Sequence, residues 1–141
     1  MIFLGADHGG FELKEHIKQM LGNQVEDCGA VTLEPDDDYP VYAKAVAQKV
    51  LQGVDNMGIL VCRSGGGMAI AANRFPGVRA VECRTPEEAR WARNDDHANV
   101  ITLSAQWVHQ DQIEEIIKAF LETPYGKDER YQRRVRKIEG Q

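Results

Sequence analysis

The sequence predicts an α/β protein with a doubly wound, five-stranded parallel sheet, helices on both faces of that sheet, and a further C-terminal helix. Strand-like apolar runs alternate with segments of helical periodicity, which is the pattern of repeated βα units. The run at residues 57–62 is apolar without alternation, as expected of a parallel strand covered on both faces. These observations predict a three-layer α/β/α arrangement in which all strands end at one edge of the sheet.

The individual strands and three of the helices follow from the spacing of apolar residues. Strands are expected at residues 2–6, 24–28, 57–62, 78–83 and 99–103. Three helices show apolar stripes at i, i+3/i+4 and i+7 spacing, in residues 13–21, 43–51 and 113–121. A short helix rich in small residues is expected directly after the strand at 57–62.

Capping signals mark where other helices begin or end. Thr85 is a predicted N-cap, followed by Pro86 and two glutamates in the first turn. Pro40 suits the first turn of the second helix, and Thr123 with Pro124 ends the helix at 113–121. A terminal helix is then expected over residues 124–138. The whole chain, residues 1–141, fits one Rossmann-like domain.

Charge and cysteine content exclude several classes of protein. The net charge of −5 gives no electrostatic reason to bind nucleic acid or an anionic membrane surface. Cys28, Cys62 and Cys83 are an odd set without a CxxC pair, which argues against a disulfide framework or a zinc site and suits a reducing cytoplasm. The sequence opens on a strand, so we expect no signal peptide and no membrane span.

A cysteine followed by a glycine-rich loop is the most informative feature. Cys62 ends the buried strand, at the edge where open α/β sheets bind ligands. Gly65, Gly66 and Gly67 leave backbone N–H groups open, and the following helix start favours a bound anion or a thiolate. The segment therefore predicts a nucleophile or base beside an oxyanion cradle. The alternative is a buried structural cysteine before an ordinary turn.

The loop after the first strand places a carboxylate and an imidazole at the same edge. Asp7 stands where a dinucleotide fingerprint needs its second glycine, which excludes a nicotinamide cofactor. Asp7 can instead orient His8 or a sugar hydroxyl, and it can also cap the following helix. Residues 62–68 lack the Lys-Ser/Thr of a nucleotide-binding loop, and Met68 stands where a cysteine phosphatase carries its clamping arginine.

Two further charged clusters allow more than one interpretation. Arg130 and Arg134 lie four residues apart and can grip one phosphate together, or they belong to a solvated basic helix or an RNA-binding tail. Asp95, Asp96 and His97 precede the fifth strand, where they form either a partial metal-ligand set or the polar end of a helix.

Several motifs, taken in order, carry a resemblance that covers nearly the whole chain. They are Gly5-Ala-Asp-His-Gly-Gly-Phe-Glu-Leu-Lys14, Asp38-Tyr-Pro40, residues 62–73, Pro76-Gly-Val-Arg-Ala80 and Arg130-Tyr-Gln-Arg-Arg-Val135. The chain resembles the ribose-5-phosphate isomerase B family and the related galactose-6-phosphate isomerase subunits. The resemblance implies aldose–ketose isomerisation of ribose 5-phosphate and ribulose 5-phosphate, a step of the pentose phosphate pathway, through a cis-enediolate. It implies no metal and no other cofactor.

The resemblance also implies roles for individual residues. Cys62 is the implied base that moves a proton between C1 and C2, while the N–H groups of residues 63–67 hold the enediolate oxygen with help from the Ser64 hydroxyl. Asp7 and His8 are the implied contacts to sugar and phosphate, and Tyr39 lines the pocket. The implied assembly is a homodimer, or a tetramer built from it, with sites shared across the interface.

The sequence departs from the family pattern at the site itself. Asp95 stands where the family carries its ring-opening histidine, with His97 as the alternative acid, and neighbouring carboxylates favour a protonated aspartate by like-charge repulsion. Gln106 stands where many members carry a phosphate-binding arginine, and Arg63 replaces a glycine. The departures allow another pentose or hexose phosphate as substrate, or a non-catalytic sugar-phosphate-binding subunit. The predicted substrate-binding residues are Asp7, His8, Tyr39, Arg63, Gly65, Gly66, Gly67, Asp96, Gln106, Arg130 and Arg134.

Overall fold

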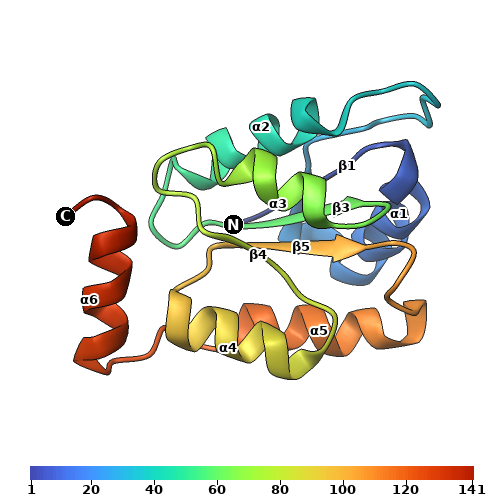
Figure 1. The fold of residues 1–141 in the computed structure, drawn as a ribbon. Coiled ribbons are helices and arrows are strands. Elements are labelled where there is room, and N and C mark those ends of the chain that lie inside the picture. The colour runs from blue at the N-terminus through green and yellow to red at the C-terminus, as the bar shows by residue number, and fades with distance from the viewer.

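Five parallel strands form one sheet in the computed structural model, which describes residues 1–141, in the order β2-β1-β3-β5-β4 (Figure 1). The strands are β1 (Ile2–Ala6), β2 (Val25–Asp27), β3 (Met57–Cys62), β4 (Ala80–Glu82) and β5 (Val100–Ser104). The central strand β3 pairs in parallel with β1, where Met57 lies opposite Ile2, and with β5, where Gly58 lies opposite Val100. The predicted doubly wound α/β fold is confirmed.

Helices cover both faces of this sheet (Figure 1). On one side lie α1 (Phe11–Leu21), α4 (Pro86–Asp96) and α5 (Gln110–Glu122), and on the other α2 (Tyr39–Val50) and α3 (Gly66–Ala72). Two short 3₁₀ helices, η1 (His8–Gly10) and η2 (Gly22–Gln24), flank α1. Alternate residues of β3 point to opposite cores: Ile59 and Val61 pack with the first helix layer, and Leu60 and Cys62 pack with the second. None of the helices is long and apolar enough to cross a membrane.

The predicted capping signals act as expected. The Thr85 hydroxyl accepts a hydrogen bond from the Glu88 N–H at 3.1 Å, and Pro86 follows it in the first turn of α4. Pro40 lies in the first turn of α2, and α5 ends at Glu122 with Thr123 as its C-cap.

The last helix, α6 (Glu129–Ile138), begins five residues later than the sequence predicted. The preceding segment is extended because its backbone bonds elsewhere: the Gly126 N–H donates to the Asn94 carbonyl at 3.0 Å. A β-carbon on Gly126 would lie 2.5 Å from that carbonyl oxygen, so the approach requires glycine. α6 packs against α4 and stands at the end of the sheet away from the strand arrowheads (Figure 1).

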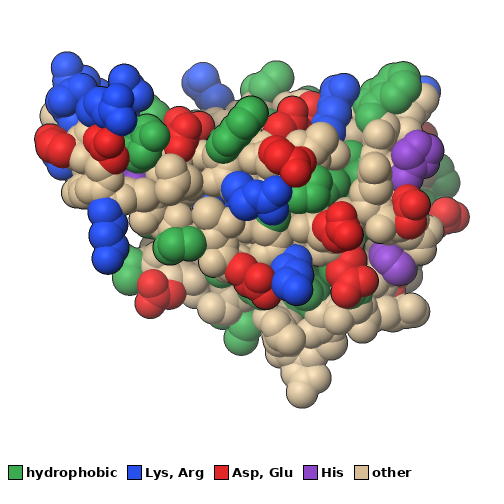
Figure 2. Space-filling model, turned by 90° about the horizontal axis from the view of Figure 1, so that it is seen from below, with side chains coloured by type: hydrophobic (Ala, Val, Ile, Leu, Met, Phe, Trp, Pro, Cys, Tyr) green, Lys and Arg blue, Asp and Glu red, His purple; other side chains and the backbone are tan.

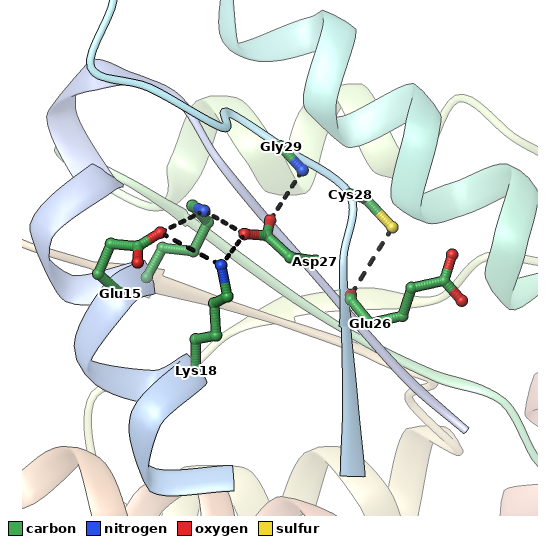
Figure 3. Close-up of polar contacts among 7 residues, drawn as sticks. Glu15, Lys18, Glu26, Asp27, Cys28 and Gly29 are labelled. Atoms are coloured by element: carbon green, nitrogen blue, oxygen red, sulfur yellow. Dashed lines mark hydrogen bonds and ion pairs between the residues drawn. The ribbon is translucent and has the colours of Figure 1, made fainter. Parts of the chain in front are cut away.

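A buried lysine links helix α1 to the edge strand β2. The Lys14 side chain is fully buried, and its Nζ lies 2.7 Å from Asp27 Oδ2 and 2.9 Å from Glu15. Lys18 contacts the same Asp27 oxygen at 3.0 Å, and the other Asp27 oxygen accepts a hydrogen bond from Gly29 N–H at 2.9 Å (Figure 3). These contacts hold the start of the loop that runs from Cys28 to α2.

Candidate active site

The thiol of Cys62 lies at the end of β3, and only 4% of the residue is exposed. The backbone N–H of Gly65 donates a hydrogen bond to Sγ at 3.1 Å. Gly65 has φ of 84°, a conformation that favours glycine and that turns this N–H back toward the thiol. The predicted pairing of Cys62 with a glycine cradle is therefore present in the structure.

The other two thiols have different surroundings. Burial raises the pKa of the Cys83 thiol to about 12, and the carboxylates of Glu88 and Glu82 add to the shift. Burial also raises the pKa of Cys28, with Glu26 adding to it. Both thiols stay protonated near neutral pH.

Tyr39 and Ser64 lie beside the glycine loop. The Tyr39 ring packs directly on Gly67, since a β-carbon there would lie 2.8 Å from the ring. Tyr39 is the first residue of α2, so the start of this helix packs against the glycine loop. Ser64 is exposed, and its hydroxyl makes no hydrogen bond within the protein, so it is free to contact a ligand.

Asp7 and His8 meet a third residue at the end of β1. Asp7 is buried, its oxygen accepts a hydrogen bond from Gly10 N–H at 3.2 Å, and burial raises the pKa of this carboxyl. The His8 N–H and Nδ1 both bond to Asp37 Oδ1, at 2.9 and 2.7 Å, and the Tyr42 hydroxyl donates to Asp37 Oδ2 at 2.9 Å. The hydrogen bond to Asp37 raises the pKa of His8, which favours the imidazolium.

Sequence reasoning missed Asp37. It lies in the acidic run at residues 34–38, which is the sequence feature that could have pointed to a functional carboxylate there. Burial opposes ionisation of Asp37, but the hydrogen bonds from His8 and Tyr42 outweigh it and lower the pKa of this carboxyl. Oxygen or nitrogen atoms of Asp7, His8 and Asp37 lie within 4.8 Å of one another, close enough for a cation. Because His8 and Asp37 already share a direct hydrogen bond, the arrangement is an ion pair, and the expected absence of metal stays a prediction.

Arg63 and Gln106 also meet at this edge. Arg63 Nε donates to Gln106 Oε1 at 2.8 Å, so two predicted substrate-binding residues from different strand ends touch. A hollow of about 360 Å³ lies between η1, α1 and the loop after β5, and Gly9, which approaches the Arg63 backbone, is part of its lining. Its lining residues are His8, Gly9, Glu12, Leu13, Leu33, Ala105, Val108 and Gln110.

The remaining predicted residues lie elsewhere in the protomer. Asp95, Asp96 and His97 are at the end of α4, next to the start of β5 and therefore at the edge opposite Cys62 (Figure 1). Arg130 and Arg134 are on α6, at the same end of the molecule, where Lys and Arg side chains gather (Figure 2). One protomer thus brings together only part of the predicted site.

At that second edge, the structure distinguishes the two candidate acids. His97 takes the left-handed conformation at the C-cap of α4, and its ring stacks on Tyr125 with centroids 4.5 Å apart. Its Nε2 lies 3.0 Å from the Gly126 carbonyl oxygen, so the ring is engaged in local contacts. Asp95 is half-buried, and its carboxylate accepts a hydrogen bond from the Asn94 side chain at 2.7 Å. Burial, with like-charge repulsion from Asp95, raises the pKa of Asp96.

Arg130 and Arg134 have different surroundings on α6. The Arg130 guanidinium contacts Asp128 at 2.8 Å, and this pairing, from a side chain and a backbone N–H together, lowers the pKa of Asp128 to about 2. Arg134 has no carboxylate partner and extends from the exposed face of α6.

Comparison with known proteins identifies the family of this chain. The family model described as Ribose/Galactose Isomerase matches residues 2–138 of the chain. The chain belongs to this family. Its fold class and the resemblance seen in its motifs are therefore confirmed.

Members of the ribose/galactose isomerase family match over nearly their whole length. The chain is 38% identical over 138 residues to ribose-5-phosphate isomerase B of Mycolicibacterium paratuberculosis, covering 95% of this chain and 86% of that protein. It is 39% identical over 140 residues to the Escherichia coli K12 protein of the same name, covering 97% and 93%.

Two solved structures are similar to the present fold. The ribose 5-phosphate isomerase of Thermotoga maritima superposes with a TM-score of 0.93 at 41% identity, covering 99% of this chain and 97% of that one. Ribose-5-phosphate isomerase B of Mycoplasma genitalium, with bound ribulose 5-phosphate, gives a TM-score of 0.92 at 37% identity, covering 99% and 93%.

Proposed function

We propose that this protein interconverts ribose 5-phosphate and ribulose 5-phosphate. The observation that carries the proposal is the Cys62 thiol, which is buried at the carboxyl edge of the sheet and hydrogen-bonded by Gly65 N–H. Membership of the ribose/galactose isomerase family supports this substrate class. No cofactor is required by the proposal, because a proton shuttle and an oxyanion cradle suffice for isomerisation through an enediolate.

In the proposed reaction, the Cys62 thiolate removes the proton from C2 of the open-chain aldose and returns it to C1, while the hydroxyl proton on O2 passes to O1. The N–H groups of residues 63–67 stabilise the negative charge that develops on the enediolate oxygen. The free Ser64 hydroxyl adds a donor, and Asp7 and His8 contact sugar and phosphate. Tyr39, packed on Gly67, limits the pocket on the α2 side.

We further propose that the protein acts as a homodimer in the cytoplasm, with its sites completed across the interface. Asp95, Asp96, Arg130 and Arg134 lie at the edge away from Cys62, so a second copy is needed to bring them to a site. Val41 on α2 and Ile70 on α3 are 62% and 70% exposed beside the glycine loop, and such apolar side chains suit a protein contact. The local contacts of His97 favour Asp95 as the ring-opening acid.

Steady-state conversion of ribose 5-phosphate to ribulose 5-phosphate tests the proposed function. We expect turnover by the unmodified protein and a loss of about 10²- to 10⁴-fold in Cys62→Ala, the range for removal of a general base. Cys28→Ala is the matched control, because that half-buried thiol has only one weak contact, to Glu26 oxygen at 3.9 Å. Equal turnover by Cys62→Ala and the unmodified protein contradicts the role of the thiol.

A second candidate is an isomerase of another pentose or hexose phosphate, which the aspartate at position 95 favours. The same assay with a panel of sugar phosphates separates the two candidates, since only the true substrate gives a turnover that depends on Cys62. Tight binding of ribose 5-phosphate without turnover of any sugar in the panel points instead to a non-catalytic binding subunit.

A further inference from the structure

Arg63 is held at the carboxyl edge by three hydrogen bonds. Its carbonyl accepts from the Ser104 hydroxyl at 2.7 Å and from Gln106 N–H at 3.2 Å, which fixes the backbone. Its side-chain Nε donates to Gln106 Oε1 at 2.8 Å, which fixes the plane of the guanidinium. The two terminal nitrogens make no hydrogen bond within the protein, so the fork is oriented and its outer donors are free.

Arg63 makes no ion pair within the protein. Among the loops that follow the strands at this edge, residues 7–10, 28–38, 62–65, 83–85 and 105–109, the only lysine or arginine besides Arg63 is Arg84. Arg84 pairs with Glu82 at 3.3 Å, whereas Arg63 has no carboxylate partner. An oriented guanidinium without an ion-pair partner is suited to bind an anion through two parallel hydrogen bonds.

The position of Arg63 suits a ligand that also reaches Cys62. Consecutive residues at the end of a strand point in opposite directions: Cys62 packs with the α2 and α3 layer, whereas the Arg63 side chain reaches Gln106 beyond β5. Gly9 approaches the Arg63 backbone, since a β-carbon there would lie 3.1 Å from Arg63 N, and Gly9 also lines the hollow. A ligand spanning thiol and guanidinium needs several bonds between its reacting carbon and its anionic group.

We propose that Arg63 binds the phosphate of the sugar phosphate within its own protomer, and that Gln106 is the positioning residue that orients the guanidinium. This inference rests on the proposed function for the identity of the ligand. His8 lines the hollow next to Gly9, whose backbone approaches Arg63, and it supplies a second donor on that side. The substrate's carbon chain then runs from Cys62 to the Arg63 and Gln106 pair.

Calorimetric titration of the full-length protein with inorganic phosphate and with ribose 5-phosphate tests the inference. We expect Arg63→Gln to weaken binding of both by about 10- to 100-fold, the value of a hydrogen bond between charged groups. Arg63→Lys is expected to restore only part of this affinity, because an ammonium cannot pair with Gln106 and still offer a planar fork. Arg84→Gln, which removes an equal charge from the same edge, is the matched control and is expected to stay within about twofold.

The role of Gln106 has its own readout. Gln106→Ala is expected to raise the KM for ribose 5-phosphate and to leave kcat within about threefold, because it disturbs phosphate placement and not the thiol. In the Arg63→Gln background, the same substitution is expected to add almost nothing, since residues that act through one contact are not additive. Full additivity of the two substitutions contradicts the positioning role.

Unchanged phosphate affinity in Arg63→Gln would overturn the inference. If the molecular mass of that variant in solution changes at the same time, Arg63 pairs with a partner subunit instead. The proposed function is judged separately: turnover of ribose 5-phosphate with no effect of Arg63→Gln refutes only the inference. Phosphate binding that depends on Arg63, without any turnover, refutes only the isomerase activity.

Discussion

At the scale of single residues, the candidate site places one buried thiol among fixed donors. Cys62 receives the Gly65 N–H, and His8 is held by Asp37 with its side chain 43% exposed. Cys62, His8 and Asp7 were predicted from the sequence because each lies at the end of a strand or directly after one. Asp37 was missed because its partner His8 is 29 residues away, and only the fold brings them together.

The ion pair between His8 and Asp37 predicts a pH dependence of ligand binding. The Asp37 hydrogen bond raises the pKa of His8 above its ordinary value of 6.5, and Asp7, Asp37 and Asp36 add charge attraction. The imidazolium is present below this raised pKa, so affinity for ribose 5-phosphate is expected to fall as the pH rises through it. In Asp37→Asn, the fall is expected to move to lower pH.

Titration of the His8 ring by NMR, with His8→Gln for assignment, together with calorimetric binding from pH 6 to 9, measures both effects. Binding is the better readout, because turnover also includes the proton-transfer step. An affinity that is flat over this range in the unmodified protein, while the His8 ring titrates, contradicts a contact between His8 and the phosphate.

At the scale of secondary structure, the sequence pattern predicted the bounds of the inner strands β1 and β3 correctly, but not those of the edge strand β4. The bounds of β1 and β3 are those predicted, because both strands are apolar throughout and lie in the middle of the sheet. The edge strand β4 covers only Ala80–Glu82 of the predicted 78–83, because Asn73 and Asn99 side chains bond the backbone of residues 77–80. Such contacts depend on tertiary neighbours that periodicity does not reveal.

The junction of α1 and β2 gives a prediction about stability. Lys14 lies on the apolar face of α1, and its fully buried ammonium depends on Asp27. Asp27→Asn is expected to cost about 3 kcal/mol of unfolding free energy, because it leaves a buried charge without its main partner. Lys18→Met is the control: Lys18 contacts the same oxygen but is 46% exposed, so a cost below about 1 kcal/mol is expected.

Urea unfolding at several pH values measures this contribution. Burial opposes ionisation of Asp27, but hydrogen bonds from Lys14, Gly29 and Lys18 lower its pKa below 3.8. Its stabilising effect is therefore present above that ordinary value and is lost as the pH falls through the lowered one. Equal costs for Asp27→Asn and Lys18→Met at pH 7 would show that the buried lysine does not depend on Asp27.

At the scale of the whole molecule, the charged and polar groups of the predicted site divide between two edges of one sheet. The carboxyl edge of the sheet carries Cys62, Asp7, His8, Arg63 and Gln106. The opposite edge carries Asp95 and Asp96, together with Arg130 and Arg134 on α6. This placement follows from the order of elements along the chain, because Asp95 precedes β5 and Cys62 ends β3. The way in which two copies associate depends on the shape of the protein surface, and the spacing of residues along the sequence does not reveal that shape.

Complementation between two inactive variants tests the proposed sharing of sites. Cys62→Ala and Asp95→Asn each remove one half of every site in a homodimer. A mixed dimer regains one site, made from the intact thiol of one protomer and the intact Asp95 of the other. Statistical mixing makes half of the dimers mixed, so co-refolding is expected to restore about a quarter of the unmodified activity. Mass in solution, measured by light scattering, separates a dimer from a tetramer. If each protomer carries a complete site, the mixture stays as inactive as its two components, because no rearrangement of subunits can unite the intact residues.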